Sequence, residues 1–149
     1  MPHENNAICL NSDHGHHDEG IADSAISPGM AIELAADGKY DQVQSALAEA
    51  MKREFPIAKE DSLQGKTIDD AYAQGDRVFF WIPLPGDRAN LLVKAGQNIT
   101  VNDVLVVEAG GSGLWVEAAG TEFRYTFKAL ESSGGALAAN GFIKARRLN

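Results

Sequence analysis

The sequence predicts a mainly β fold: a small β-sandwich or barrel-like domain over residues 26–149, with an extended N-terminal arm over residues 1–25 and at most one short helix. Two observations support this prediction. From residue 26 onward, short apolar runs alternate with turn-forming pieces. The first 25 residues combine few large apolar side chains with all four histidines of the chain. A chain of 149 residues fits one compact domain with an appended arm.

The N-terminal arm is the first predicted element. Its large apolar residues are too few to offset the entropy lost on ordering, unless the segment lies on something else. We therefore expect a partner or a neighbouring subunit to hold it. The expected contact residues are the apolar anchors Ile8, Leu10 and Ile21 and the polar residues His14, His16 and His17.

For residues 43–51 the sequence is compatible with either a helix or a strand. Val43, Leu47 and Met51 recur with intervening alanines at helical spacing, and Pro56 follows, which slightly favours an amphipathic helix. A strand is also possible, with the alternating series Val43, Ser45, Leu47, Glu49 and Met51.

Turn-forming pieces divide the rest of the chain. They include SPGM at 27–30, DGK at 37–39, QGD at 74–76, PGD at 85–87, AGQN at 95–98, VND at 101–103, GGSG at 110–113 and SSGG at 132–135. Turns at this spacing, with Val, Ile, Phe and Trp between them, are typical of a sandwich or small barrel. We expect strands over 77–84, 89–93, 104–108, 114–118, 122–129 and 141–148.

Several of these strands are apolar on both faces. With a period of two, Phe79 and Trp81 point one way while Phe80 and Ile82 point the other, and the run around Trp115 is similar. Another layer, the 43–51 segment or a second subunit could cover the outward faces, or the strands could be central within one chain. Phe79, Trp81 and Trp115 are therefore candidates for an oligomer interface or for the core.

The formal net charge of −8 disfavours two classes of partner. Phosphate backbones and anionic lipid headgroups are repelled by such a chain, so we expect neither nucleic acid nor membrane as a partner. No apolar run reaches the length of a membrane span, and the N-terminus lacks a signal-peptide pattern, so we expect synthesis in the cytoplasm. The single Cys9 has no second thiol and is expected to be a small, half-buried apolar residue.

Residue patterns of catalytic centres are missing from residues 26–149. That region has no histidine, phosphate loop, dinucleotide fingerprint, HExxH or CxxC pattern. We expect no enzyme activity, no catalytic residue and no cofactor. The acidic residues Asp69, Asp70 and Asp76 lack the spacing of a calcium loop. His14, His16 and His17 lie among acids, but on a flexible arm we expect a polar contact surface there rather than a metal site.

An ordered series of motifs resembles the decoration, or cement, proteins of tailed bacteriophage capsids. The motifs are SPGM at 27–30, the acidic LQGK turn at 60–66, IDDAYAQGD at 68–76, PLPGD at 83–87 and AGQNI at 95–99, and the resemblance as a whole extends over about 120 residues. Where the family usually has Gly-Asp after the last motif, this chain has Asn102-Asp103. Asn tolerates positive φ, so we expect the turn to be kept.

The resemblance implies a function without catalysis. It implies a β-rich protein on the outer surface of the virion capsid, made in the host cytoplasm, that binds the major capsid protein and stabilises the head. It also implies self-association, with a trimer favoured over a dimer, and an extended conformation for residues 43–51.

An alternative from another class is a barrel-sandwich carrier or small-ligand binding module. Such domains carry biotin or lipoate on a lysine at an exposed hairpin tip. Lys94, beside Ala95 and Gly96, is the nearest candidate, but it lacks the flanking Met or Asp pattern.

Overall fold

A computed structural model describes residues 7–10, 15–44, 55–119 and 126–149. Within these ranges the chain is almost entirely β, and the predicted fold class is confirmed. The strands are β1 (His16–Ile21), β2 (Ile32–Leu34), β3 (Tyr40–Gln42), β4 (Ile57–Ala58), β5 (Arg77–Ile82), β6 (Arg88–Val93), β7 (Val104–Val107), β8 (Trp115–Glu117), β9 (Phe127–Ala129) and β10 (Gly141–Arg147); one short 3₁₀ helix, η1 (Ser62–Gln64), follows β4.

Five strands form a closed barrel in the order β10-β6-β8-β7-β9. The longest seam joins β10 and β6 in antiparallel register, from Gly141 opposite Val93 to Arg146 opposite Arg88. All five lie in segments where the sequence predicts strands, and β5, which pairs outside the barrel, is confirmed too.

The second edge of β6 is completed by pieces from three distant segments. Leu10 N–H donates to the Arg88 carbonyl, and Asn90 N–H donates to the Ile8 carbonyl. Further along, Leu92 N–H donates to the Gly29 carbonyl, and Val93 pairs with Trp115 of β8. The glycine of the SPGM turn is required here, because a Cβ at Gly29 would lie 2.8 Å from the backbone N of Leu92.

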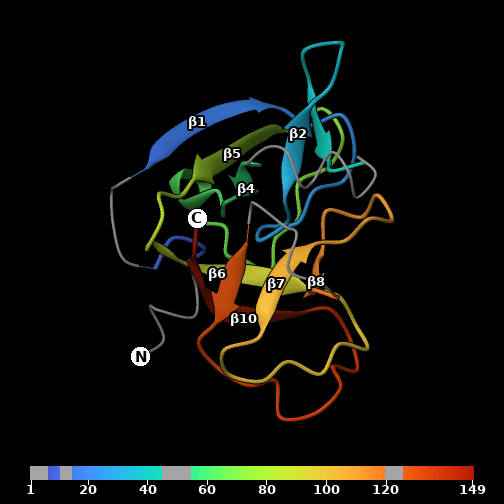
Figure 1. Ribbon diagram of the computed structural model, residues 1–149. Helices are drawn as coiled ribbons and strands as arrows, with labels where there is room; N and C mark the ends of the chain where they lie inside the picture. The colour runs from blue at the N-terminus through green and yellow to red at the C-terminus, as the bar shows by residue number, and fades with distance from the viewer. Residues whose placement is uncertain (1–6, 11–14, 45–54, 120–125) are drawn as a thin grey trace.

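A second layer is formed by the sheet β1-β5-β4 and the hairpin β2-β3, which Figure 1 shows above the barrel strands. Isolated bridges connect the two, from Ala31 to Ile57 and from Ala22 to Tyr40. The four strands of this layer outside β5 were not predicted, because they are short or, in β1, polar and exposed.

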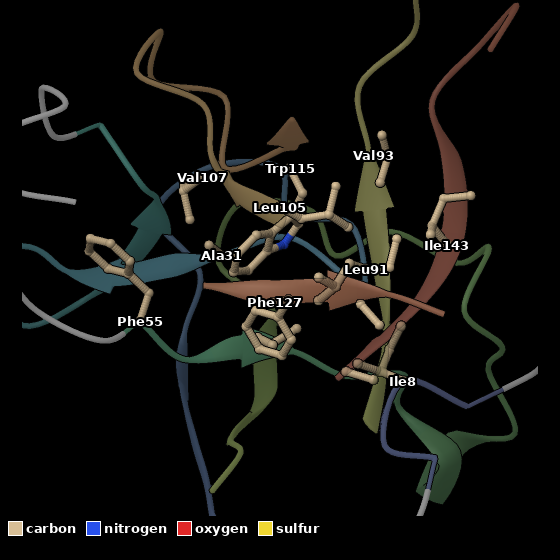
Figure 2. Close-up of a cluster of buried hydrophobic side chains, with 14 of the residues drawn as sticks. Ile8, Ala31, Phe55, Leu91, Val93, Leu105, Val107, Trp115, Phe127 and Ile143 are labelled. Atoms are coloured by element: carbon tan, nitrogen blue, oxygen red, sulfur yellow. The ribbon is translucent and has the colours of Figure 1, made fainter. Parts of the chain in front are cut away.

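Apolar side chains of β5 alternate between two cores, as its period-two pattern predicts. Trp81 packs into the main cluster with the barrel residues, while Val78 and Phe80 pack into a smaller cluster with Tyr40. Trp115 lies in the main cluster, and Figure 2 shows Ile8 pointing into the same cluster. Trp81 and Trp115 are fully buried, so of the two roles considered for them, the core is the one observed. The chain's own layers bury Trp81 on one face of β5 and Val78 and Phe80 on the other, while Phe79 stays half-buried.

Predicted turns are also found. Gly38, Gly75, Gly86 and Gly96 all have positive φ in turns. Asn102 has a φ of 77° and is the one non-glycine residue with positive φ in the described part of the chain, as expected for the Asn-Asp replacement.

Part of residues 1–25 is packed on the rest of the chain. Ile8 is fully buried, and Cys9 is half-buried against the main cluster, as expected for that residue. The boundary at residue 25 stays a prediction. Of the described residues before it, Cys9 bridges to Ala89 of β6, and β1 pairs with β5. The question of helix or strand for 43–51 falls largely on residues 45–54, which lie outside the described residues.

Candidate interaction surface

The pairing of β1 with β5 brings several predicted contact residues onto one face. Their antiparallel register places His17 opposite Trp81, Glu19 opposite Phe79 and Ile21 opposite Arg77. Opposite residues point to the same side of a sheet. The face therefore joins His17 and Ile21, predicted as arm contacts, with Phe79 and Trp81, predicted as strand residues.

One ion pair and one side-chain hydrogen bond lie around the half-buried Phe79 on this face. The Glu19 Oε1 and Arg77 Nη1 atoms are 3.6 Å apart. Lys59, whose backbone N–H donates to the Phe79 carbonyl, places its Nζ 2.9 Å from Nδ1 of His17. Ile21 is 42% exposed beside these pairs. We call the set Ile21, Phe79, Glu19, Arg77, Lys59 and His17 the β1–β5 face.

The imidazole of His17 also covers a buried tryptophan. Its ring stacks on Trp81 with centroids 6.0 Å apart and an interplanar angle of 17°. The preceding Gly15 allows this approach, because a Cβ there would lie 2.5 Å from Nε1 of Trp81. His17 is thus fixed in position at one end of the face.

The opposite side of β1 packs on the β2–β3 hairpin. A Cβ at Gly20 would lie 2.4 Å from Cδ2 of Tyr40, so only glycine allows this ring to lie on β1. The Tyr40 ring also contacts Phe80 at a centroid distance of 4.5 Å. Burial, and then the charge of Asp18, raise the pKa of Tyr40.

The remaining predicted contact residues lie elsewhere. Ile8 is inside the core and offers no exposed surface. Leu10 is half-buried beside β6. His16 is exposed, with its Nε2 3.5 Å from the Asp18 carboxylate. His14 lies outside the described residues.

A small polar pocket adjoins the β1–β5 face and shares Arg77 with it. Its volume is about 70 Å³, and it is lined by Asp61, Gln64, Lys66, Tyr72, Asp76 and Arg77. Sequence reasoning did not single out this site, since it assigned the 60–66 piece and the 68–76 loop to turns.

The turn geometry explains how these residues are held. Asp61 caps η1 by accepting from the Gln64 N–H, and Gly65 ends the helix in the left-handed conformation. The Tyr72 hydroxyl donates to the Lys59 carbonyl at 2.6 Å. Burial raises the pKa of Tyr72, a hydrogen bond from the Phe79 N–H lowers it, and the nearby charges of Asp61, Glu60 and Asp76 raise it further, to about 12 in all. The hydroxyl is therefore neutral at physiological pH.

Other candidate sites from the sequence have local structural partners. Asp70 accepts from the Thr67 N–H at 2.7 Å and Asp76 from the Ala73 N–H at 2.8 Å, as in turns. Lys94 pairs with Glu108, which also accepts from the Ser112 hydroxyl. Over the described ranges, no group of three His, Cys, Asp or Glu side chains is placed to hold a metal ion.

Helices of membrane-spanning length and hydropathy are not found in the part of the chain that the structure describes. Cys9 is the one cysteine of the sequence, so it forms no disulfide within the chain.

Comparison with known proteins finds a likeness among solved structures. No protein-family model and no curated protein matches the chain. Among solved structures, it is similar to the N base of the head fiber gp8.5 of bacteriophage phi29, with a TM-score of 0.51 and 12% identity. The match covers 91% of this chain and 95% of that one. At this identity the likeness shows a common fold.

Proposed function

We propose that this chain is a structural protein of a tailed-phage head, which attaches to the outer capsid surface and stabilises the head. The observation that supports this proposal most is the likeness to the base of a phage head fiber, which covers nearly the whole of both chains. The ordered motifs that resemble capsid decoration proteins are a separate line of support, because they were identified in the sequence alone.

Attachment to a lattice needs no single strong contact. Many weak contacts, repeated over identical subunits, add through avidity and shift the stability of the assembled state. The net charge of −8 favours solubility before assembly and keeps the chain away from nucleic acid.

The β1–β5 face is our candidate for the capsid contact. It combines the exposed Ile21 and half-buried Phe79 with the Glu19–Arg77 ion pair and the polar side chains of Lys59 and His17 at its rim, the arrangement of an apolar centre in a polar border found at protein interfaces.

Self-association is proposed on the resemblance alone, with a trimer favoured over a dimer. Trp81 and Trp115, two of the apolar strand residues that favour self-association in the sequence, are buried within one chain. Light scattering of the free chain, and of heads with bound chain, tests this part: a mass of one subunit in solution together with no subunit contacts on the head would reject it.

Cosedimentation with heads purified without this protein tests the function. Bound chain in the pellet, and greater resistance of the heads to heat, are the expected results. Heads that neither bind the chain nor change in heat resistance would overturn the proposal.

Two variants test the face. Ile21→Glu places a charge on the β1–β5 face and is expected to weaken head binding by roughly tenfold or more. Val101→Glu, at a 52% exposed position in the turn before β7, is the matched control and is expected to bind normally. Equal binding by both variants would assign the contact to another surface.

A further inference from the structure

Three basic side chains form a row across the outer face of the barrel. Arg146 of β10 lies directly opposite Arg88 of β6 and directly opposite Lys128 of β9. The neighbours of Arg146 along β10, Ala145 and Arg147, are buried, so Arg146 points away from the barrel interior. Neighbouring strands are about 4.8 Å apart, so the row spans about 10 Å. We call Arg88, Arg146 and Lys128 the basic row.

This arrangement costs stability within the chain. Like charges directly opposite each other on neighbouring strands repel, whereas an acid opposite a base attracts. Beyond Lys128 the next residue in register is Val104 of β7, so the described strands place no acidic residue in the basic row. A repulsion that the fold itself does not need is typical of a surface kept for binding.

Charge is distributed unevenly between the two layers of the molecule. Residues 15–44 and 55–82, which form the second layer, hold eleven acidic and four basic residues. Residues 83–119 and 126–149, which form the barrel, hold five acidic and six basic residues. The basic row therefore lies on a barrel with almost no net charge, and the negative charge of the chain is concentrated on the other layer.

The second layer carries the opposite arrangement on its hairpin. Glu33 of β2 lies directly opposite Asp41 of β3, so two like charges again meet in register. Their sequence neighbours Ile32 and Tyr40 pack into the smaller apolar cluster, so the two carboxylates face outward. Figure 1 shows this hairpin well apart from β6 and β10. The acidic pair and the basic row are thus two separate surfaces of one chain.

Local hydrogen bonds fix both carboxylates. Glu33 accepts from the Gln44 N–H at 2.8 Å. Asp41 accepts from the Gln42 N–H at 2.8 Å and from the Ser24 hydroxyl. These donors are neutral, so they hold the side chains in position and leave their charges unpaired by the bonds. Two fixed carboxylates, one strand spacing apart, complement a row of cations with the same spacing.

We propose that the basic row of one copy of this chain binds the Glu33–Asp41 pair of a second copy. Charge complementarity favours this occupant, and each guanidinium can hold a carboxylate through two parallel N–H donors. Because the two surfaces differ, the contact is heterologous and repeats from copy to copy until a ring closes. The inference rests on the self-association proposed above and assigns the surfaces that form it.

Sedimentation velocity of the full chain tests the contact. Wild type is expected to associate at low salt and to dissociate at high salt, since salt screens charge pairs at a surface. Arg146→Glu is expected to weaken association by roughly tenfold or more. Lys66→Glu makes the same charge change at an exposed position outside the basic row. It is the matched control and should associate like wild type.

A charge exchange tests which surface the basic row meets. Glu33→Lys alone is expected to weaken association by roughly tenfold, as Arg146→Glu does. The double variant, Arg146→Glu with Glu33→Lys, is expected to associate more strongly than either single variant, because the two surfaces again have opposite sign. If Glu33→Lys does not fold, Glu33→Gln replaces it and is expected to weaken association.

Stability of the single subunit separates binding from a structural role. Arg146→Glu replaces two repulsions by attractions to Arg88 and Lys128. At a concentration where both proteins are single subunits, its urea midpoint is therefore expected to lie above that of wild type. A lower midpoint would show that the basic row supports the fold, and would overturn the proposal.

Three further results would overturn the proposal: wild type that stays a single subunit at low salt, Arg146→Glu that associates like wild type, or a double variant no better than the single ones. Binding of a short DNA duplex by wild type but not by Arg146→Glu would assign the basic row to nucleic acid instead.

Cosedimentation with heads keeps this inference distinct from the proposed function. Head binding by a wild-type chain that does not self-associate would support the function and overturn the inference. Self-association that follows the charge exchange, in a chain that does not bind heads, would do the reverse.

Discussion

Trp115 joins the barrel to the SPGM turn through one indole ring. Its Nε1 donates to the Gly29 carbonyl at 3.0 Å, and its ring meets the edge of Phe127 at a centroid distance of 5.0 Å. The same carbonyl accepts from Leu92, so the turn, β6 and β8 meet at one oxygen.

We expect Trp115→Phe to lower the free energy of unfolding by about 1–3 kcal/mol, through loss of this hydrogen bond and of ring volume. Trp115→Ala should cost about 3–5 kcal/mol, as for other large-to-small changes in a core. Urea unfolding followed by circular dichroism measures both. A Trp115→Phe variant as stable as wild type would show that the indole N–H contributes nothing at this position.

Glu108 makes stability depend on pH. Burial opposes its charged form, but hydrogen bonds from Lys94 and Ser112 and the Lys94 charge outweigh this and hold its pKa below the ordinary value of 4.5. Because the folded pKa is the lower one, the stabilisation is fully present above pH 4.5 and is lost as the pH falls through the folded pKa.

We therefore expect Glu108→Gln to be less stable than wild type at pH 7, by about 1 kcal/mol since Lys94 is partly exposed, with the difference shrinking below pH 4.5. Unfolding free energies at several pH values test this. Glu117→Gln, at an exposed position, is the control and should show no such trend. A constant difference from pH 7 to pH 3 would contradict the assignment.

At the scale of elements, the β1–β3 contact depends on one glycine. The Tyr40 ring occupies the space that a Cβ at Gly20 would need. We expect Gly20→Ala to destabilise the fold by about 1–3 kcal/mol, the usual cost of overpacking. In a Tyr40→Ala background the added methyl meets no ring, so the same change should cost much less there. Thermal unfolding of the four proteins measures this coupling, and additive effects would contradict it.

The sequence predicts the elements that have a strong local pattern. Strands such as β5 and β6 are rich in large apolar residues and bounded by glycine turns, and they are found where predicted. By contrast β1 has the sequence HHDEGI and is almost wholly exposed, so its hydrogen bonds to β5 decide its conformation. The two-residue β4 has no periodicity to recognise.

The sequence predicts individual residues of the candidate surface but not the surface that they form together. His17, Ile21, Phe79 and Trp81 were each identified from local composition, but their meeting on one face follows from the register of β1 on β5, a pairing of residues about 60 positions apart. The pocket was missed because Asp61 and Asp76 are typical turn residues; only the fold shows that Asp61 is buried.

At the scale of the whole molecule, the N-terminal segment links the barrel to the loop before η1. Ile8 is buried in the main cluster, its N–H donates to the Glu60 carboxylate at 3.0 Å, and the Asn90 side chain donates to the Ala7 carbonyl at 2.7 Å. These contacts differ from those of an arm that orders only on a partner, because they lie within one chain.

Two truncations separate a role in folding from a role in attachment. Deletion of residues 1–10 removes Ile8 and the strand-like bonds to β6, so we expect a loss of about 2–5 kcal/mol of stability, comparable to that of an Ile→Ala core change. Deletion of residues 1–6 removes none of the described contacts and serves as the control. Differential scanning calorimetry of the free proteins measures stability, and cosedimentation with heads measures attachment. A 1–10 deletion that melts like wild type but no longer binds heads would contradict the folding role. It would show instead that residues 7–10 contact a partner, as the composition of the arm predicts.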